Sequence, residues 1–263
     1  MAKAFSRPAT FRDVSTNYCP GCGHGIIQRL VAEVVDEMGI RERTIGLPPV
    51  GCAVYLDLYL DFDMVQPAHG RTPAVATGLK RALPDHIIIG YEGDGGLAAI
   101  GTAEVIHAAN RGENITMIFV NNAVYGMTGG QMAPTTLVDQ KTATTPLGRN
   151  PERDGYPLRL CELLATLDGA AYLVRTTVSS PANVRKTKKA IRKAIEVQMG
   201  KLGFSMVEVL SPCPTNWGLN PVDAMKWIEE KMISYFPLGE FKTPEDKNEV
   251  LIDDTPKREP KTK

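Results

Sequence analysis

Four of the five cysteines lie in short segments that are rich in glycine and proline. Cys19 and Cys22 form a Cys-x-x-Cys pair, Cys52 follows a glycine, and Cys213 stands between two prolines. Turns of this composition let thiolates point inward while the backbone curls round a metal centre. Their types and spacing therefore indicate the ligands of one iron–sulfur cluster.

A second set of polar residues follows two strand-like segments in the middle of the chain. Asp94 stands in a Gly-Asp-Gly-Gly turn after the apolar run 86–91, and Asn122 closes an Asn-Asn pair after the run 114–120. Ligands of doubly wound sheets bind at the carboxyl ends of strands, so both side chains would lie on that edge. Together with the backbone carbonyl of Val124 they offer three oxygens, a set that suits Mg²⁺ when phosphate and water complete its coordination.

The glycines after Asp94 extend this interpretation. Gly95 and Gly96 open a helix, and their bare backbone can approach a phosphate that the helix N-terminus also attracts. A Gly-Asp-Gly turn by itself is most often only a turn, and an Asn-Asn pair by itself carries little information. Their joint position after consecutive strands is what predicts a diphosphate and metal site.

Alternating helix-like and strand-like segments must position these residues, and the alternation predicts an α/β fold with one doubly wound, mostly parallel sheet. The expected helices are 25–38, 72–83, 97–110, 156–167 and 181–199, and the expected strands are 44–47, 86–91, 114–120, 171–175 and 204–210. Residues 121–156 lack a clear period, and a loop of that length is usually functional or part of an interface. We expect one domain over 1–240 with cluster-binding loops, and a polar tail over 241–263 that is flexible or bound to a partner.

The composition narrows the class of protein. The chain has 263 residues, 43% of them apolar, and its 30 basic and 30 acidic residues cancel, which predicts no extended nucleic-acid surface. No segment approaches the roughly 20 apolar residues of a membrane span, and the first residues lack the apolar core of a signal peptide. We therefore expect a cytoplasmic protein without membrane or nucleic-acid partners, whose cysteines are not paired in disulfides.

Taken in order, the motifs resemble one family. They are Cys-Pro-Gly-Cys-Gly-His, Val-Gly-Cys, Ala-His-Gly-Arg, Gly-Asp-Gly-Gly, Asn-Asn-x-x-Tyr-Gly-Met-Thr-Gly-Gly-Gln and Ser-Pro-Cys-Pro, spread from Tyr18 to Pro214. This combination is similar to the β subunit of 2-oxoacid:ferredoxin oxidoreductases, including the thiamine diphosphate motif that runs from Gly-Asp-Gly to Asn-Asn.

The resemblance implies a set of cofactors and the residues that bind them. Thiamine diphosphate, Mg²⁺ and one [4Fe–4S] cluster would be bound, with Cys19, Cys22, Cys52 and Cys213 as thiolate ligands and Asp94, Asn122 and the Val124 carbonyl on Mg²⁺. The residues implied around the cofactor are Val50, Gly51, Cys52, Ala53, His69, Gly95, Gly96, Gly126 and Met127. His69 would be the catalytic residue, unless it serves only as a capping or core hydrogen-bond partner. His24 has the position of a structural residue, and Cys161 lies on an apolar helix face typical of a core.

The resemblance also implies a reaction and a set of partners. It is the oxidative decarboxylation of a 2-oxo acid with coenzyme A to an acyl-CoA and CO₂, with electrons passing through the cluster to ferredoxin. The sequence contains no second α/β module for the pyrimidine half of the cofactor, which implies an α subunit with the active site at the interface. Subunits γ and δ, the latter ferredoxin-like, would complete the complex, and the loop 121–156 is the candidate contact to substrate and partner.

Substrate choice and two rival functions stay open at this point. Residues 125–136 contain no Lys or Arg for a second carboxylate, which favours branched-chain 2-oxo acids such as 2-oxoisovalerate over 2-oxoglutarate, unless a partner supplies the cation. One rival is a non-redox thiamine diphosphate decarboxylase or synthase in which the cysteines bind structural zinc. The other is a non-catalytic redox or interaction subunit that has lost the cofactor, against which the intact Asp94 and Asn122 argue.

Overall fold

A seven-stranded sheet forms the centre of the protein in the computed structural model, which describes residues 6–245. The strands lie in the order β2-β1-β3-β4-β6-β5-β7, and all neighbours are parallel except the β5–β7 pair. The strands are β1 (Thr44–Leu47), β2 (Asp63–Met64), β3 (Ile87–Gly93), β4 (Thr116–Asn121), β5 (Ala170–Thr177), β6 (Phe204–Leu210) and β7 (Gly239–Lys242). The expected doubly wound α/β fold is confirmed.

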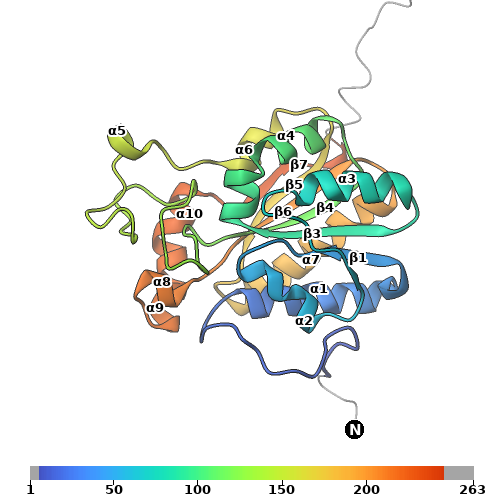
Figure 1. Ribbon diagram of the computed structural model, residues 1–263, viewed down its shortest axis with the longest axis horizontal. Helices are drawn as coiled ribbons and strands as arrows, with labels where there is room; N and C mark the ends of the chain where they lie inside the picture. Colours follow the sequence, from blue (N-terminus) through green and yellow to red (C-terminus); the bar gives the residue numbers. More distant parts are fainter. Residues whose placement is uncertain (1–5, 246–263) are drawn as a thin grey trace, which may run out of the picture.

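Helices cover both faces of this sheet (Figure 1). The α-helices are α1 (His24–Met38), α2 (Leu56–Tyr59), α3 (Thr72–Ala82), α4 (Thr102–Asn110), α5 (Pro151–Asp154), α6 (Leu160–Ala165), α7 (Pro181–Met199), α8 (Pro214–Trp217), α9 (Pro221–Trp227) and α10 (Ile233–Tyr235). Short 3₁₀ turns η1 (Arg41–Arg43) and η2 (Cys52–Tyr55) and the π-helical turns η3 (Gly96–Ile100) and η4 (Ile228–Met232) complete the elements.

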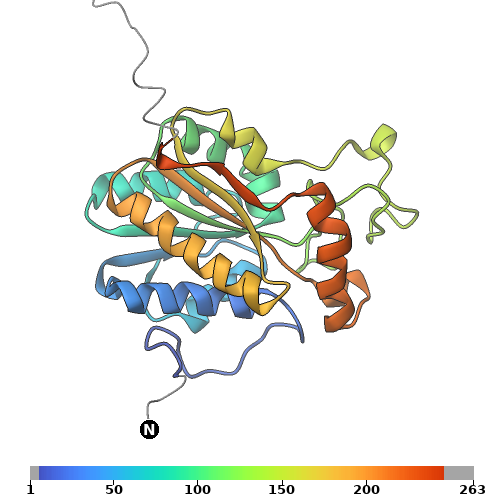
Figure 2. The same cartoon turned by 180° about the vertical axis from the view of Figure 1, so that it is seen from behind.

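Two apolar layers join the helices to the sheet. The side chains of α1 and α7 pack with the sheet in one core cluster. Those of α3, α4 and α6 pack with the sheet in a second core cluster. Seen from behind, α1 and α7 run next to each other across one face (Figure 2). A third, smaller cluster around Ile228, Met232 and Phe236 joins the C-terminal helices to the end of β6.

The order of the strands creates a crevice where the chain changes direction. The chain runs from β1 outward to β2 and then returns to the other side of β1 as β3. Ligands of open α/β sheets bind at such a switch point, outside the carboxyl ends of the strands. The loops after β1 and β3 hold the sequence motifs around Cys52 and Asp94.

Most predicted elements are observed with small shifts at their ends. Helix α1 ends at Gly39, whose positive φ of 63° closes it in the left-handed conformation. Strand β1, helix α7 and strand β6 begin and end at the predicted residues. Helix α6 is shorter than the predicted 156–167, because residues 155–159 form an extended approach to it.

Two differences from the prediction matter for the site and for the domain boundary. The helix expected over 97–110 is broken: η3 precedes α4, and the Gly101 amide donates to the Gly96 carbonyl across five residues. Strand β7 pairs with β5 as far as Lys242, so ordered structure continues past the expected boundary at residue 240. The rest of the expected tail, from residue 246, lies outside the described residues.

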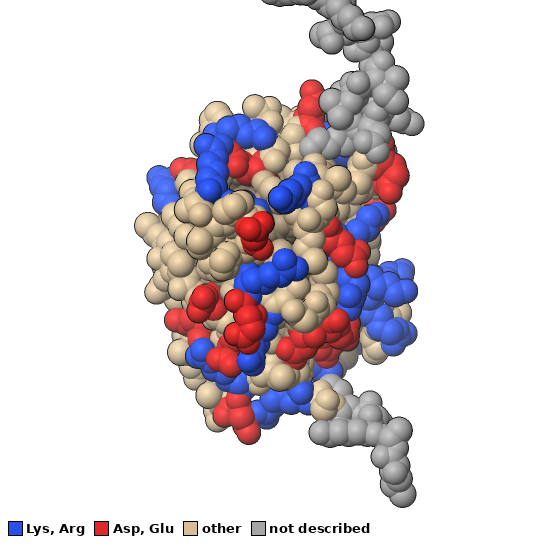
Figure 3. All heavy atoms as spheres, turned by 90° about the vertical axis from the view of Figure 1, so that its right-hand side faces the viewer, with Lys and Arg blue, Asp and Glu red and all other residues tan. Residues whose placement is uncertain are grey.

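Over the described residues, the side of the surface away from the 121–156 loop has no large patch of a single charge. In the space-filling view of that side, acidic and basic side chains are interspersed (Figure 3). Within residues 6–245, none of the helices is both long and apolar enough to cross a membrane.

Candidate functional site

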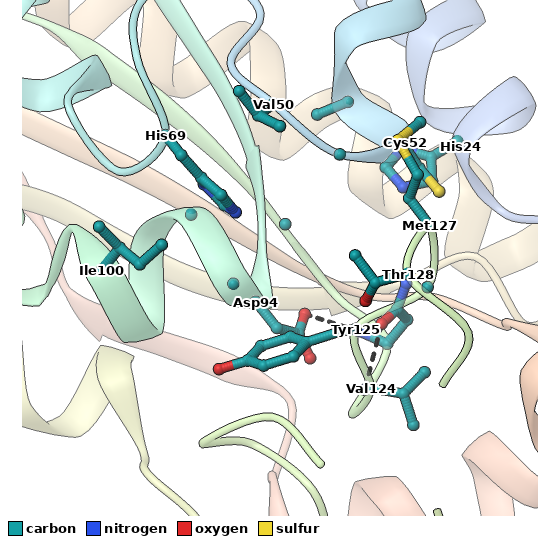
Figure 4. A pocket seen from close by; sticks show the side chains of 17 residues that line it. His24, Val50, Cys52, His69, Asp94, Ile100, Val124, Tyr125, Met127 and Thr128 are labelled. Atoms are coloured by element: carbon teal, nitrogen blue, oxygen red, sulfur yellow. Dashed lines mark hydrogen bonds between the residues drawn. The ribbon is translucent and has the colours of Figure 1, made fainter. Parts of the chain in front are cut away.

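A pocket opens at the carboxyl ends of β1, β3 and β4. Every residue expected near the cofactor or Mg²⁺ lines it, namely Val50, Gly51, Cys52, Ala53, His69, Asp94, Gly95, Gly96, Asn122, Val124, Gly126 and Met127. His24, Gly93, Ile100, Tyr125 and Thr128 also contribute to its wall. Figure 4 shows His69 on one side and Cys52 with Met127 on the other, while Asp94 and Tyr125 form the base.

Among residues 6–245, Asp94 is the only carboxylate in the lining of this pocket. Its side chain is 2% exposed, and burial raises its pKa to about 7, against the opposing effect of the hydrogen bonds it accepts. One carboxylate oxygen accepts a hydrogen bond from the backbone amide of Asn122 at 3.1 Å, and the other accepts one from the Thr135 hydroxyl. A carboxylate has about four acceptor positions, so lone pairs remain for a cation. A bound divalent ion would compensate the cost of this buried charge.

The turn after β4 presents the other two expected metal ligands. Ala123 has a φ of 59°, a left-handed conformation that is uncommon for a residue other than glycine. The Asn121 side-chain oxygen accepts the Ala123 amide at 3.2 Å, and the Asn122 side-chain oxygen accepts the Val124 amide at 3.3 Å. Trp217 donates to the Asn122 carbonyl at 3.0 Å. These bonds hold Asn122 and Val124 against the pocket.

Gly95 lies where a side chain would fill the pocket. A Cβ at this position would stand 3.2 Å from two ring carbons of Tyr125 and 3.6 Å from the His69 ring. The bare backbone therefore leaves a space between these two rings at the start of η3. This is the position where a diphosphate can meet backbone amides.

His69 is brought to this space by a close contact of two loops. Gly70 has a φ of 75°, and a Cβ on Gly101 would stand 2.5 Å from the Gly70 carbonyl oxygen. Only glycine at both positions lets the His69 loop approach the break between η3 and α4. The His69 Nδ1 atom is buried and has no hydrogen-bond partner, and burial lowers the pKa of the ring. A neutral imidazole with an unused nitrogen therefore borders the pocket.

Hydrogen bonds and close contacts join the segments that carry the four motif cysteines. The Gly23 amide donates to the Pro212 carbonyl at 3.3 Å, which joins the Cys19–Cys22 loop to the segment of Cys213. The Tyr18 hydroxyl donates to the Cys52 carbonyl at 2.9 Å. A Cβ on Gly126 would stand 3.5 Å from the Cys52 sulfur and 3.6 Å from the Cys213 sulfur, so both thiols lie close to the same glycine.

Burial, and to a lesser degree the neighbouring thiols, raise the pKa of Cys22, Cys52 and Cys213, so these three stay protonated when no cation is near. The pKa of Cys22 rises to about 12, chiefly through burial and then through Cys213, Cys52 and Cys19. The pKa of Cys52 rises to about 11 for the same reasons, with Cys213 and Cys19 as neighbours. Asn216 donates to the Cys213 sulfur at 3.2 Å. The thiols of Cys22, Cys52 and Cys213 can ionise together only if a positive centre binds near them.

Cys161 and His24 lie where the sequence suggested. Cys161 is fully buried on α6 within the core cluster that includes α4 and is not part of the cysteine group. The His24 ring stacks on Tyr18 and its Nδ1 lies 2.8 Å from the Tyr91 hydroxyl, while burial lowers the pKa of His24 to about 4. His24 also lines the pocket and follows Cys22 by two residues, so the Cys19–Cys22 loop leads directly to the wall of the cavity.

Two features of the site were missed by the sequence analysis. Tyr125 follows the Asn-Asn turn and its ring forms the base of the pocket beside Gly95. Thr135 reaches Asp94 from the middle of the long loop. The Tyr-Gly-Met-Thr sequence after the Asn-Asn pair was a signal for Tyr125, whereas nothing local distinguishes Thr135 from the loop's other threonines.

Comparisons with known proteins identify the family. Residues 51–209, more than half of the chain, match the family described as "Thiamine pyrophosphate enzyme, C-terminal TPP binding domain". The 2-oxoglutarate synthase subunit KorB of Archaeoglobus fulgidus is 40% identical over 215 residues, which cover 82% of this chain and 76% of the relative. The chain belongs to the thiamine pyrophosphate-binding subunits of 2-oxoacid:ferredoxin oxidoreductases.

Other members of this subunit family are closer in sequence or known in structure. The ketoisovalerate oxidoreductase subunit VorA of Methanothermobacter thermautotrophicus is 48% identical over 248 residues, which cover 94% of this chain and 52% of VorA. The chain thus spans about half the length of the VorA relatives it matches. A solved 2-oxoglutarate:ferredoxin oxidoreductase from Magnetococcus marinus, with 2-oxoglutarate, coenzyme A and succinyl-CoA bound, is similar with a TM-score of 0.72 and 27% identity over 95% of this chain and 90% of that one.

Proposed function

We propose that this chain is the thiamine diphosphate- and cluster-binding β subunit of a 2-oxoacid:ferredoxin oxidoreductase. The complex would convert a 2-oxo acid, coenzyme A and oxidised ferredoxin to an acyl-CoA, CO₂ and reduced ferredoxin. The observation that carries this proposal is the position of Cys52: it lines the same pocket as Asp94 and Asn122. A cluster on that thiolate would be next to the cofactor from which it takes electrons, and cysteine-bound clusters reach the low potentials of ferredoxin chemistry.

The pocket suits the diphosphate end of the cofactor. Asp94, Asn122 and the Val124 carbonyl would hold Mg²⁺, and the backbone of Gly95, Gly96, Gly126 and Met127 would border the diphosphate. Val50, Gly51, Ala53 and His69 would border the rest of the cofactor, with His69 as the catalytic side chain. When bound, thiamine diphosphate supplies the electron sink for decarboxylation.

The cysteine group suits a cluster better than a structural zinc ion. Hydrogen bonds and close contacts bring the cysteine segments together: the Gly23 amide next to Cys22 donates to the Pro212 carbonyl next to Cys213, and the Cys52 and Cys213 sulfurs lie near the same glycine. Cys52 also lines the pocket of Asp94 and Asn122, where an electron-accepting cluster would have a role and a structural zinc ion would have none. We therefore favour a [4Fe–4S] cluster over the rival zinc-binding decarboxylase or synthase.

A partner subunit would complete the site. Residues 6–245 form one α/β unit, and the apolar side chains of Val50, Ile100 and Met127 are about half exposed at the pocket. These side chains favour cover by another protein surface, which we assign to an α subunit that carries the pyrimidine-binding module. The γ and ferredoxin-like δ subunits would pass the electrons on.

Removing a cluster ligand gives a prediction about iron content. Cys213→Ser should lose the cluster iron, because Cys213 stands beside Cys52 and its loop is bonded to the Cys19–Cys22 loop. Cys161→Ser is the matched control, because Cys161 is a buried core thiol on α6 and should keep the iron. Iron and acid-labile sulfide are measured on anaerobically purified protein. Equal iron in the two variants would show that the ligand set is wrong.

The substrate is proposed to be a branched-chain 2-oxo acid. No Lys or Arg lines the pocket within the described residues, so the chain itself offers no side-chain cation for the second carboxylate of 2-oxoglutarate. The similarity to VorA supports this choice, whereas KorB and the Magnetococcus structure keep 2-oxoglutarate as the alternative.

A substrate panel tests the proposed function. The purified complex should reduce ferredoxin with 2-oxoisovalerate and coenzyme A, with kcat/KM at least about tenfold above that for 2-oxoglutarate, the ratio expected when one carboxylate lacks its partner. Preference for 2-oxoglutarate would overturn the substrate assignment and point to a cation from the partner. Release of an aldehyde without ferredoxin reduction would instead support the non-redox decarboxylase.

A further inference from the structure

The long loop between β4 and α5 contacts both Asp94 and the turn that carries Asn122 and Val124, the two parts of the proposed metal site. The sequence analysis expected this loop to face substrate and partner. Thr135 and Thr136 lie in its middle and are fully buried. Neither threonine lines the pocket. Their hydroxyls point instead at Asp94 and at the turn that carries Asn122 and Val124.

Thr135 orients the carboxylate. Its hydroxyl donates to one oxygen of Asp94, whose other oxygen accepts a hydrogen bond from the backbone amide of Asn122. The two donors approach different oxygens, so together they fix the plane of the carboxylate group. Metal-ligating carboxylates are commonly fixed by such outer hydrogen bonds, and loss of one typically lowers metal affinity.

Thr136 stabilises the unusual turn. Its hydroxyl donates to the carbonyl of Ala123 at 2.6 Å, and the Ala123 amide is already bonded to the Asn121 side chain at 3.2 Å. Both backbone groups of the residue with φ of 59° are therefore held. A left-handed alanine persists only where its surroundings over-determine it, and this conformation sets the direction of the following Val124.

Arg149 joins the two threonines to the segment that follows α5. It is 4% exposed, and its Nη1 atom donates to the carbonyls of Thr136 at 2.5 Å and of Pro134 at 2.9 Å. Its Nε and Nη2 atoms donate to the carbonyls of Gly155 and Tyr156, both at 2.8 Å. The planar guanidinium thus joins both sides of the threonine pair to residues 155–156 in a geometry that a lysine cannot reproduce.

We propose that Thr135 and Thr136, held in place by Arg149, are positioning residues that preorganise the Mg²⁺–diphosphate site through Asp94 and Ala123. This inference rests on the proposed function, since it takes Asp94, Asn122 and Val124 as the metal ligands. It assigns to the middle of the loop a role in cofactor affinity in place of substrate contact.

The test is Mg²⁺-dependent binding of thiamine diphosphate, measured by calorimetry on the anaerobically purified complex. Thr135→Val keeps the shape and removes the donor, and Thr135→Ser keeps the donor, so the first should weaken binding roughly ten- to hundredfold and the second should restore it. Arg149→Lys should also weaken binding at least about tenfold through loss of the planar contacts. Arg153→Lys is the matched control, because Arg153 is exposed and bonds its neighbour Asp154, and it should bind like the parent.

Asp94→Asn in the same titration distinguishes failure of the proposed metal site from failure of the positioning role. If Asp94→Asn binds normally, the proposed metal site is wrong. If Asp94→Asn loses binding while Thr135→Val and Arg149→Lys bind like the parent, the metal site stands and the positioning role is overturned. A purely structural role would lower the melting temperature of Thr135→Val and Thr135→Ser alike without a selective change in Mg²⁺ dependence. If Thr135→Val does not fold, Arg149→Lys and the pair Thr136→Val and Thr136→Ser decide in the same way.

Discussion

Asp94→Ala is expected to abolish Mg²⁺-dependent binding of thiamine diphosphate, with a loss of affinity of at least about a hundredfold. Asp94 is the only carboxylate that the described part of the chain contributes to the pocket lining, so the alanine variant leaves a divalent cation with neutral protein oxygens. It also frees the Asn122 amide and the Thr135 hydroxyl, which are buried and would lose their acceptor. Both effects weaken the same site.

The experiment needs to separate the cofactor from the cluster. Iron content of Asp94→Ala should equal that of the parent, because the cysteine loops are fastened by other bonds, such as that from Gly23 to Pro212. Asp85→Ala removes an exposed carboxylate on the loop before β3 and should bind the cofactor normally. Unchanged calorimetric affinity in Asp94→Ala would remove the metal assignment.

The second large effect is expected from the chain on its own, which should show no turnover with any 2-oxo acid. Thiamine diphosphate, Mg²⁺, coenzyme A and ferredoxin should not rescue it, because the described residues provide one α/β unit and hence only one half of a two-module site. Correct orientation of reacting groups is worth at most about 7–11 kcal/mol of a reaction barrier, and half a site forfeits much of that.

Reconstitution gives the control for this experiment. Addition of the α subunit should restore turnover, whereas a variant with Met127→Asp at the half-exposed rim of the pocket should be restored less well. Turnover by the isolated chain would show that the second module is not required.

The layered fold was predictable because its strands and helices carry strong local patterns. The buried runs of β3, β4 and β6 are almost continuously apolar, as parallel strands covered on both faces must be. Helix α7 begins at Pro181 after the capping Ser180 and keeps its apolar residues at helical spacing. These signals fix element type without knowledge of the tertiary structure.

The C-terminal helices were left without a prediction, although part of their sequence carries a helix signal. Asn220 caps α9, Pro221 opens it, and Ala224, Ile228 and Met232 recur at helical spacing through α9 and η4. Before this run, Pro214 and Gly218 confine α8 to four residues, which is too short for a period to form. Packing of Trp217, Ile228 and Phe236 in one cluster with Leu210 holds these helices at the end of β6.

Some residues of the candidate site are marked by sequence motifs, whereas others are brought to it only by the fold. Glycine-flanked motifs mark Asp94, Asn122 and Cys52 in the sequence, because a turn at the end of a strand needs those residue types. The bond from Thr135 to Asp94 spans 41 residues, and the six carbonyls that accept from Arg149 belong to two short segments, residues 133–136 and 154–156, on either side of it in the chain. Only the folded chain reveals those partners.

In the proposed function, one chain joins a cofactor site to an electron-accepting cluster. The most direct test is the electron paramagnetic resonance spectrum of the anaerobic complex of this chain with its α subunit alone, after addition of 2-oxoisovalerate and coenzyme A. We expect the signal of a reduced [4Fe–4S] cluster in the parent, and none in Asp94→Ala at equal iron content. A silent parent, or an equal signal in Asp94→Ala, would contradict the account.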